Sequence, residues 1–473
     1  MVDKGTGLTF WMDTVLSECA RAGSGFDPDA VHDLRVALRR CRSIADGFMV
    51  FDSDRAWRDM KRASRKLFRE LGNLRDIHVM SAWVQRLSGH SDGAAAILSA
   101  HLARQEQMQK DEALASLAGF DAAQWSSWRD SLALRSGRIP AGNQVFQHLA
   151  LERWRDARLL HRTALRNRSA VAFHNLRIGL KRFRYTVENF LPDRLDEWGG
   201  DLREVQDLLG ESHDLFILWR TALRIGAFRG AGLRSRWRAI IARERNQRLQ
   251  RYRNKMCGPD SAWRIWRAGL PAGEEVRALA VARLGMWAQY HDPDCDHSRH
   301  VAELAGQILA GLASHKRSAG PDSAEMEAMI EAAALLHDVG RLVAAKDHHR
   351  ISARMIRRLE PPLGFDADQM RRIALIARYH RGAAPRSSHG RFMAFTERDR
   401  RLITFLAGIL RLANAFDLAH NGRIRKLELE QRPHSILIRA RGYLEQDPLA
   451  QSLACARSLL EVSCQMPVWV EKA

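Results

Sequence analysis

The chain is poor in cysteine, and its few cysteines lie far apart. They stand at positions 19, 41, 257, 295, 455 and 464, with no Cys-x-x-Cys pair among them. A disulfide framework needs a higher density of cysteines, and a zinc knuckle needs them in close pairs. The sequence therefore excludes both classes of protein, and scattered reduced thiols are typical of the cytoplasm.

Long apolar segments are also absent. A membrane helix needs about 18 consecutive apolar residues, and the sequence has no such run. The first residues, Met-Val-Asp-Lys-Gly-Thr-Gly, lack the charged and then apolar order of a secretion signal. We therefore expect a cytoplasmic protein without a membrane partner. Because 46% of its 473 residues are apolar, the chain can form real cores, and its length predicts two or three domains.

Positive charge is abundant and unevenly distributed. The formal net charge is +20, and residues 151–256 hold 24 Lys and Arg against 12 Asp and Glu, whereas residues 1–150 hold 20 against 18. More than half of the excess thus lies in one stretch. Such a field attracts a polyanion, which could be nucleic acid, an acidic membrane surface or polyphosphate. A solvated basic surface with no specific partner is the alternative.

A basic motif occurs twice. Its first copy is His32, Arg35, Arg39, Arg40 and Arg42, and 142 residues later the same spacing gives His174, Arg177, Lys181, Arg182 and Arg184. On an α-helix at roughly 100° per residue, offsets 0, 3, 7 and 10 fall within an arc of about 80°. Apolar residues fill the positions between, so both copies predict amphipathic helices with a basic stripe. One such helix is usually ordinary surface, but surface decoration gives no reason for the same stripe twice.

A second motif repeats at a similar separation. Leu71-Gly72-Asn73-Leu74-Arg75-Asp76 is similar to Leu209-Gly210-Glu211-Ser212-His213-Asp214. We interpret both copies as turns, the first one ending a second basic helix over residues 53–72 that carries Lys61, Arg62, Arg65 and Lys66. Together the repeats predict a duplication with halves of about 7–135 and 140–256. If the halves pack about a pseudo-twofold axis, both basic faces line one groove that suits a long anion.

On these motifs, residues 7–256 resemble the CHAD domain. The resemblance implies an all-helical domain of two pseudo-symmetric four-helix halves, which binds inorganic polyphosphate along a basic central groove. Guanidinium groups form charge-assisted, often bidentate bonds with phosphate oxygens, which agrees with such a ligand. Nucleic-acid binding is less favoured because the aromatic residues fall at core positions of the helices. The contacts implied are His32, Arg35, Arg39, Arg40, Arg42, His174, Arg177, Lys181, Arg182 and Arg184, with Lys61, Arg62, Arg65 and Lys66 as weaker candidates.

Residues 257–275 contain two prolines and several glycines and predict a linker. Spaced histidines follow it, with His297, the doublet His337-Asp338, His348 and His380 on successive predicted helices. Neutral imidazoles and a hard carboxylate oxygen are the ligands of a hydrolytic divalent metal. A lone histidine is more often structural, but this joint occurrence favours a metal site.

This second part resembles the HD superfamily of metal-dependent phosphohydrolases, and more closely the C-terminal region of the exopolyphosphatase and guanosine pentaphosphatase family. The motifs are residues 333–340, 377–381 and 409–417. The resemblance implies an all-helical HD-type domain over residues 276–473, with a small antiparallel β-sheet that includes a hairpin at about 426–440. It implies one or two ions of Mn²⁺, Mg²⁺ or iron, with His337 and Asp338 as catalytic residues. The metal ligands it implies are His297, His337, Asp338, His348, His380 and Asn414 or Asp417.

The sequence departs from that family in two ways. Asn414 stands where the family usually has aspartate, so a neutral oxygen replaces an anionic one. The catalytic N-terminal half of the family has no counterpart, since an actin-like ATPase fold needs strands and glycine-rich phosphate loops and residues 1–260 read as helices.

Taken together, the sequence predicts a mainly α, polyphosphate-binding protein with an HD-type, phosphohydrolase-like module. The module would hydrolyse polyphosphate or a phosphorylated nucleotide. The alternative is a non-catalytic protein with a degenerate HD site that serves as a sensor or targets polyphosphate granules. A nucleic-acid-binding protein is the third reading.

Overall fold

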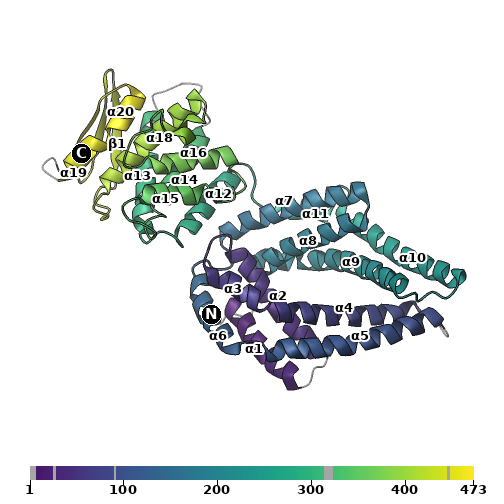
Figure 1. Ribbon diagram of the computed structural model, residues 1–473. Coiled ribbons are helices and arrows are strands. Elements are labelled where there is room, and N and C mark those ends of the chain that lie inside the picture. The colour runs from purple at the N-terminus through teal and green to yellow at the C-terminus, as the bar shows by residue number, and fades with distance from the viewer. Residues whose placement is uncertain (1–6, 25–27, 90–91, 314–322, 445–447) are drawn as a thin grey trace. The chain divides into compact units, whose positions relative to one another are not determined.

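The computed structural model describes residues 7–24, 28–89, 92–313, 323–444 and 448–473 and divides the chain into two compact units, Met1–Pro271 and Ala272–Ala473. Both units are built mainly from helices, with one small sheet near the C-terminus (Figure 1), so the predicted mainly α class is confirmed. Within the described residues, no helix is both long and apolar enough to cross a bilayer.

The first unit contains two sets of four long helices. The first set is α1 (Leu8–Ser24), α2 (Pro28–Phe48), α4 (Arg65–Leu87) and α5 (Gly93–Ala118), with short helices α3 (Arg55–Ala63) and α6 (Ala122–Ser136). The second set is α7 (Gln144–Asn167), α8 (Ala170–Phe190), α9 (Pro192–Arg224) and α10 (Ala231–Met256). In each set the long helices pack on one another in chain order, and α4 with α5 and α9 with α10 form long hairpins (Figure 1). The two sets meet where α2 packs on α8 and α4 packs on α9.

Polar residues begin several of these helices. The side chain of Asn143 accepts a hydrogen bond from the backbone N–H of Val145 at the start of α7, and the Ser169 hydroxyl accepts one from that of Ala172 at the start of α8. Such caps satisfy backbone donors that have no partner inside the helix. They also fix where α8, the second basic helix, begins.

The repeated Leu-Gly motif differs from its expected role as a turn. Residues 71–76 lie inside α4 and residues 209–214 inside α9, while the first break comes earlier, at Ser64 between α3 and α4. A single glycine in a helix interior costs only about 1 kcal/mol, which the packing of a long helix outweighs. The motif therefore marks a close contact between helices instead of a helix end.

The segment predicted as a linker also contains structure. Residues 257–275 include helix α11 (Ala262–Ala268), in which Trp263 and Trp266 are fully buried. The rings of these two tryptophans lie against Trp154 and Phe183 of the first unit. The flanking prolines and glycines made the segment look like a loop, but two indole rings bury enough apolar area to hold this short helix in the first core.

The second unit is a helical core with a sheet attached. Its helices are α12 (Glu274–Ala288), α13 (Cys295–Ala313), α14 (Ser323–Leu336), α15 (His348–Ile356), α16 (Ala367–Arg378), α17 (Gly390–Met393), α18 (Glu397–Phe416), α19 (Pro448–Ala456) and α20 (Ser458–Cys464). The apolar helix α14 packs against α12, α13, α16 and α18. This places the chain that leaves α14 in the middle of the unit.

The sheet has strand order β1 (Leu427–Arg432), β2 (Ser435–Ala440) and β3 (Val468–Lys472). Strands β1 and β2 form the predicted hairpin, with Leu427 opposite Ala440 and Arg432 opposite Ser435. Strand β3 differs from the expected antiparallel arrangement, because it pairs with β2 in parallel. Along the chain, helices α19 and α20 connect β2 to β3 and return the chain to the end of the sheet where β2 began, as a parallel connection requires.

Candidate functional site

Helices α2 and α8 carry four cations that form no ion pair with any described residue. Arg35 and Arg39 come from α2, and Arg177 and Lys181 come from α8 at the matching positions. Within the described part of the chain none of the four forms an ion pair, and the Nε atoms of Arg35 and Arg39 are buried without a hydrogen-bond partner. We call these four residues the cation cluster.

The four charges lie close enough to repel one another. Burial, together with the charges of Arg39, Arg177 and Arg35, lowers the pKa of the Lys181 ammonium to about 7. Burial and the neighbouring Arg39 likewise lower the pKa of Arg35. Burial and mutual repulsion thus both disfavour the charged forms of these side chains in the free protein.

Two carboxyl groups lie beside the cation cluster, one from each copy of the Leu-Gly motif. Burial raises the pKa of Asp76 although Arg35 and Arg177 oppose the rise. Burial also raises the pKa of Asp214 to about 6, and the negative charge of Asp76 contributes to this rise. Reading the motif as a turn hid this position of both aspartates.

Tyr185 is a further neighbour that the sequence did not single out. Its ring centre lies 5.6 Å from the guanidinium carbon of Arg39 and 5.7 Å from Nζ of Lys181. Its hydroxyl is buried and has no hydrogen-bond partner. In the sequence, only its place directly after Arg184 of the basic motif could have pointed to Tyr185. An aromatic residue at such a position is normally interpreted as part of the core.

Three other predicted contacts are engaged within the protein instead. Arg40 forms an ion pair with Glu188 at 2.6 Å, and Arg184 pairs with the same carboxylate at 2.6 Å. Arg42 donates hydrogen bonds to the carbonyl of Lys61 at 2.5 Å and to the Ser64 hydroxyl at 3.1 Å, where α3 ends. These arginines brace helices, so the structure does not present them as free cations.

The remaining predicted contacts differ in exposure. His32 is exposed, and His174 is half-buried with its ring centre 4.7 Å from that of His213. Lys61 pairs with Asp46, and Arg62 lies 3.6 Å from Asp59. Arg65 and Lys66 are exposed on α4, and Arg182 lines a separate cavity of α8. The centre of the predicted groove is therefore the cation cluster.

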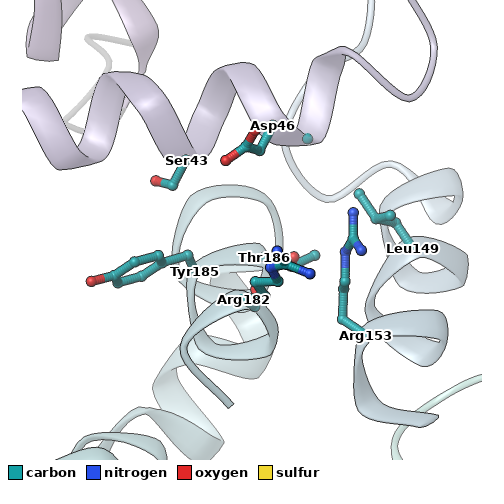
Figure 2. A pocket seen from close by; sticks show the side chains of 8 residues that line it. Ser43, Asp46, Leu149, Arg153, Arg182, Tyr185 and Thr186 are labelled. Atoms are coloured by element: carbon teal, nitrogen blue, oxygen red, sulfur yellow. The ribbon is translucent and has the colours of Figure 1, made fainter. Parts of the chain in front are cut away.

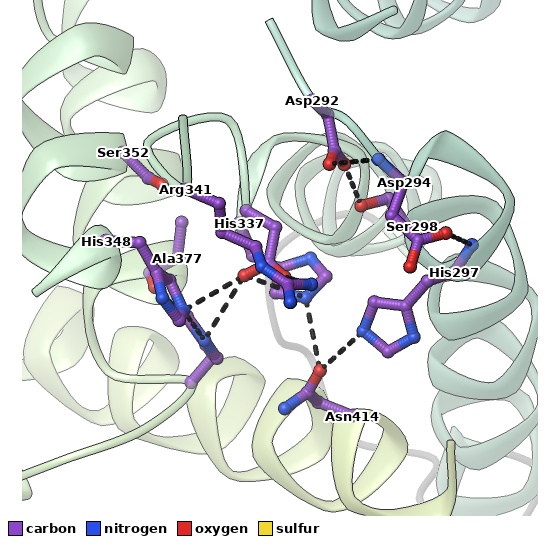
Figure 3. A network of polar contacts seen from close by, with 12 residues as sticks. Asp292, Asp294, His297, Ser298, His337, Arg341, His348, Ser352, Ala377 and Asn414 are labelled. Atoms are coloured by element: carbon purple, nitrogen blue, oxygen red, sulfur yellow. Dashed lines mark hydrogen bonds and ion pairs between the residues drawn. The ribbon is translucent and has the colours of Figure 1, made fainter. Parts of the chain in front are cut away.

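The second unit brings four of the predicted histidines together (Figure 3). His297 belongs to α13 and His348 begins α15, while His337 directly follows α14 and His380 comes two residues after the end of α16. All four side chains are buried. The apolar cores of these helices thus direct polar rings from separate segments into one small space.

Each ring is held by its Nδ1 atom. The Nδ1 atoms of His337, His348 and His380 lie 2.6 to 2.7 Å from the backbone carbonyls of residues 334, 345 and 377, and Nδ1 of His297 lies 2.8 Å from a carboxylate oxygen of Asp417. Carbonyl and carboxylate oxygens only accept hydrogen bonds, so Nδ1 carries the proton in each neutral ring. Burial lowers the pKa of His297 and lowers that of His380 far below its usual value, which favours neutral rings. Each Nε2 atom then carries no proton and presents a lone pair.

These lone pairs face other acceptors. The Asn414 side-chain oxygen lies 3.0 Å from Nε2 of His297 and 3.2 Å from Nε2 of His337. A buried carboxylate oxygen of Asp338 lies 3.1 Å from Nε2 of His348 and has no hydrogen-bond donor. The Nε2 atoms of His348 and His380 are 3.2 Å apart. Acceptors that converge without donors repel one another unless a cation lies among them.

The geometry fits two adjacent metal positions that share one carboxylate. His297, His337 and Asp338 offer ligand atoms within 4.8 Å of one another, and so do Asp338, His348 and His380. Burial opposes ionisation of Asp338, but the neighbouring His337, His348 and His380 hold the pKa of its carboxyl well below the usual range. An anionic oxygen with neutral imidazoles is a suitable donor set for a divalent transition metal.

The two candidates for the last ligand take different places. Asn414 points into the centre, whereas Asp417 lies behind His297, where it receives the Nδ1 proton and also hydrogen bonds from the backbone N–H groups of residues 421 and 422. Asp417 is thus a support for His297 and not a ligand in this arrangement. One helical turn separates the two residues, and sequence spacing alone could not tell which of them faces inward.

Two neighbours of the centre were missed in the sequence. Arg341 forms an ion pair with the outer oxygen of Asp338 at 3.1 Å and remains one-third exposed. The ring of His420 stacks on that of His297 with ring centres 3.6 Å apart, and its Nδ1 lies 2.6 Å from Asp294. Arg341 directly follows Gly340 and could have been found by its place after the His-Asp doublet, but no local pattern identified His420.

Comparison with known families divides the chain in the same way. Residues 12–223 match the CHAD domain family, and residues 276–453 match the family described as Ppx/GppA phosphatase, domain III. Both resemblances seen in the sequence are therefore confirmed. A solved structure, the CHAD domain from the plant Ricinus communis, is 20% identical and covers 58% of this chain and 95% of its own length, with a TM-score of 0.37.

Proposed function

Since the chain joins a CHAD domain to a Ppx/GppA domain III, we propose that it binds inorganic polyphosphate on its first unit and carries a metal-dependent phosphohydrolase site on its second. The observation that carries the binding proposal is the cation cluster of Arg35, Arg39, Arg177 and Lys181, which lies on two helices and has no ion-pair partner among the described residues.

The cluster favours a flexible chain of phosphates. Desolvated like charges destabilise the free protein, and an anion with one charge per phosphate unit relieves this repulsion. Arginine forks bind phosphate oxygens in pairs, and the partnerless Tyr185 hydroxyl adds a donor. Proteins that bind single-stranded nucleic acid use exposed aromatic rings for stacking, whereas at the cluster Tyr185 is buried and Phe68, whose ring centre lies 5.6 Å from the Arg35 guanidinium carbon, is partly buried.

A binding experiment with variants tests the first part. Arg39→Gln and Arg177→Gln should each weaken the affinity for long-chain polyphosphate by about tenfold, because each removes a charge-assisted contact. Arg155→Gln is the matched control, since Arg155 is an exposed arginine of α7. Equal affinity in all three variants would contradict the proposal, and so would displacement of polyphosphate by duplex DNA at equal phosphate concentration.

The second unit supports hydrolysis through its donor set. The residues that would hold one or two divalent ions are His297, His337, Asp338, His348, His380 and Asn414. Such an ion would polarise a phosphoryl group and acidify a water molecule. The chain itself holds the Nε2 lone pairs inward through the Nδ1 hydrogen bonds, and the Arg341 guanidinium beside Asp338 is placed to receive phosphate oxygens. Polyphosphate and phosphorylated nucleotides are the substrate classes.

Phosphate release with added Mn²⁺ or Mg²⁺ tests this second part. His337→Ala should abolish release, whereas His434→Ala, a control at the exposed turn of the hairpin, should leave it unchanged. If wild-type protein binds the metal but releases no phosphate above the His337→Ala background, the second unit is a sensor or targeting module instead of an enzyme.

A further inference from the structure

A cavity of about 250 Å³ lies between α2, α7 and α8. Its lining includes Ser43, Asp46, Leu149, Arg153, Arg182 and Thr186. Figure 2 shows the side chains of Arg153 and Arg182 extending into the same space from two different helices. No step of the proposed function uses this cavity.

The duplication provides an internal comparison for it. The offset of 142 residues that relates His32 to His174 also relates Arg40 to Arg182, Asp46 to Glu188 and Trp11 to Arg153. In the first half Arg40 is fully compensated: it pairs with Glu188 at 2.6 Å, donates to the Asn189 side-chain oxygen at 3.2 Å and lies over the ring of Trp11 at 5.5 Å.

The second half lacks this compensation. Neither Arg153 nor Arg182 forms an ion pair with any described residue, although both line the cavity. Asp46 is the carboxylate of the lining, and its charge is taken by Lys61. The arginine at position 153 thus adds a second charge where the first half has an indole ring. Two guanidinium groups that share one recess without a carboxylate partner leave their N–H donors available to an anion.

The cavity is separate from the cation cluster. Tyr185 lines the cavity, and its ring also lies 5.6 Å from the Arg39 guanidinium carbon and 5.7 Å from the Lys181 ammonium. The tyrosine therefore lies between the two groups of cations. Arg153 and Arg182 line the cavity, whereas none of the four cations of the cluster does.

We propose that this cavity is a second anion site, in which Arg153 and Arg182 bind one phosphate or diphosphate group. Two guanidinium forks match the oxygens of a phosphate. The hydroxyls of Ser43 and Thr186 also line the recess, but they donate their protons to the backbone carbonyls of Arg40 and Arg182, so the arginines are the donors for the anion. At about 30 Å³ for each water molecule, the volume corresponds to about eight waters, so a long polymer does not fit inside. The phosphate comes either from free inorganic phosphate or pyrophosphate, or from the end of a polyphosphate chain bound on the cluster.

Calorimetric titration with inorganic pyrophosphate tests the proposal. The full chain with Arg39→Gln and Arg177→Gln serves as background, so that binding on the cluster does not mask the second site. In this background, Arg153→Gln and Arg182→Gln should each raise the Kd for pyrophosphate by about tenfold, the loss expected for one charged contact. Arg155→Gln, on the exposed side of α7, should leave the Kd unchanged.

A second variant guards against misfolding. Arg153→Trp gives the second half the residue that fills the corresponding place in the first, so it should abolish pyrophosphate binding while the melting temperature stays the same or rises. The proposal is overturned if the background protein binds no pyrophosphate, or if Arg153→Gln and Arg182→Gln bind it with unchanged affinity.

Long-chain polyphosphate distinguishes the two sources. With an intact cluster, Arg153→Gln should leave polyphosphate affinity unchanged if the ligand is a free phosphate and should lower it if the ligand is a chain end. Either outcome accompanies the loss of pyrophosphate binding and supports the site. This inference does not rest on the proposed function, because failure of Arg39→Gln to weaken polyphosphate binding would refute that function and leave the pyrophosphate result standing.

Discussion

Arg35 lies against Gly72 of the neighbouring helix, and a Cβ atom at position 72 would stand 3.7 Å from the Arg35 Nε atom. The second half repeats this relationship, since a Cβ atom at Gly210 would stand 3.8 Å from Nε of Arg177. The two repeated motifs are thus one structural device. Each glycine leaves a flat strip of helix on which an arginine of the cation cluster lies.

Two replacements of Gly72 should therefore distinguish the effect of side-chain size on Arg35 from the effect of glycine on helix stability. Gly72→Ala places a methyl group in ordinary contact with Arg35, so polyphosphate affinity should hold, and the helix should gain about 0.5–1 kcal/mol in free energy of unfolding. Gly72→Leu should displace Arg35 and weaken polyphosphate binding as Arg35→Gln does. Titration of the three variants with long-chain polyphosphate checks this, and strong binding by Gly72→Leu would show that Arg35 needs no such strip.

Polyphosphate affinity should fall as pH rises from about 5.5 to 8. The free protein loses the Lys181 charge as pH passes its pKa of about 7, and it gains the Asp214 charge as pH passes about 6. Both changes remove attraction for a polyanion, so they act in the same direction. The charged groups that influence Lys181 are Arg39, Arg177, Arg35, Arg184 and Asp76.

Two variants separate these titrations. Lys181→Arg keeps its charge and should flatten the decline above pH 7, whereas Asp214→Asn should flatten the part near pH 6. Lys181 also affects stability: its folded pKa lies below its unfolded value of 10.5, so stability of the free protein should rise from about pH 7 to 10.5. A wild-type affinity that does not change between pH 5.5 and 8 would rule out this role.

The sequence predicted the mainly helical class and the four histidines that the structure brings together in the second unit, because these depend on periodicity and on the spacing of chemical groups. It did not predict which cations are free. Arg39 and Arg40 are adjacent and chemically identical, yet one belongs to the cluster and the other pairs with Glu188, more than a hundred residues away. Likewise, only the packing of α18 on α13 shows that Asn414 faces inward and Asp417 supports His297. Such assignments depend on tertiary contacts, which local patterns do not contain.

Asn414→Asp should strengthen metal binding. The Asn414 oxygen already lies 3.0 Å and 3.2 Å from the Nε2 atoms of His297 and His337, and the change adds a negative charge without altering shape. We expect the Kd for Mn²⁺ to fall by about tenfold or more, because a carboxylate is a stronger ligand than an amide for a divalent ion. Metal titration of the metal-free protein measures this. An unchanged or higher Kd would mean that the side chain at position 414 is not a ligand of the ion.

Asp417→Asn should weaken metal binding although Asp417 is not placed as a ligand. The carboxylate accepts the Nδ1 proton of His297, and this contact fixes the ring so that Nε2 points to the centre. Loss of such a support typically costs 10- to 100-fold in metal affinity.

The same carboxylate accepts hydrogen bonds from two backbone N–H groups, so a general loss of structure must be separated from the effect on the ring. The melting temperature of the metal-free protein makes that separation: we expect a small change there and a large change in the Kd for Mn²⁺. Asp294→Asn, which removes the charge partner of the stacked His420, serves as a comparison one contact further out. If Asp417→Asn binds Mn²⁺ as tightly as wild type, the orientation of His297 is set by the stacked ring and not by the carboxylate.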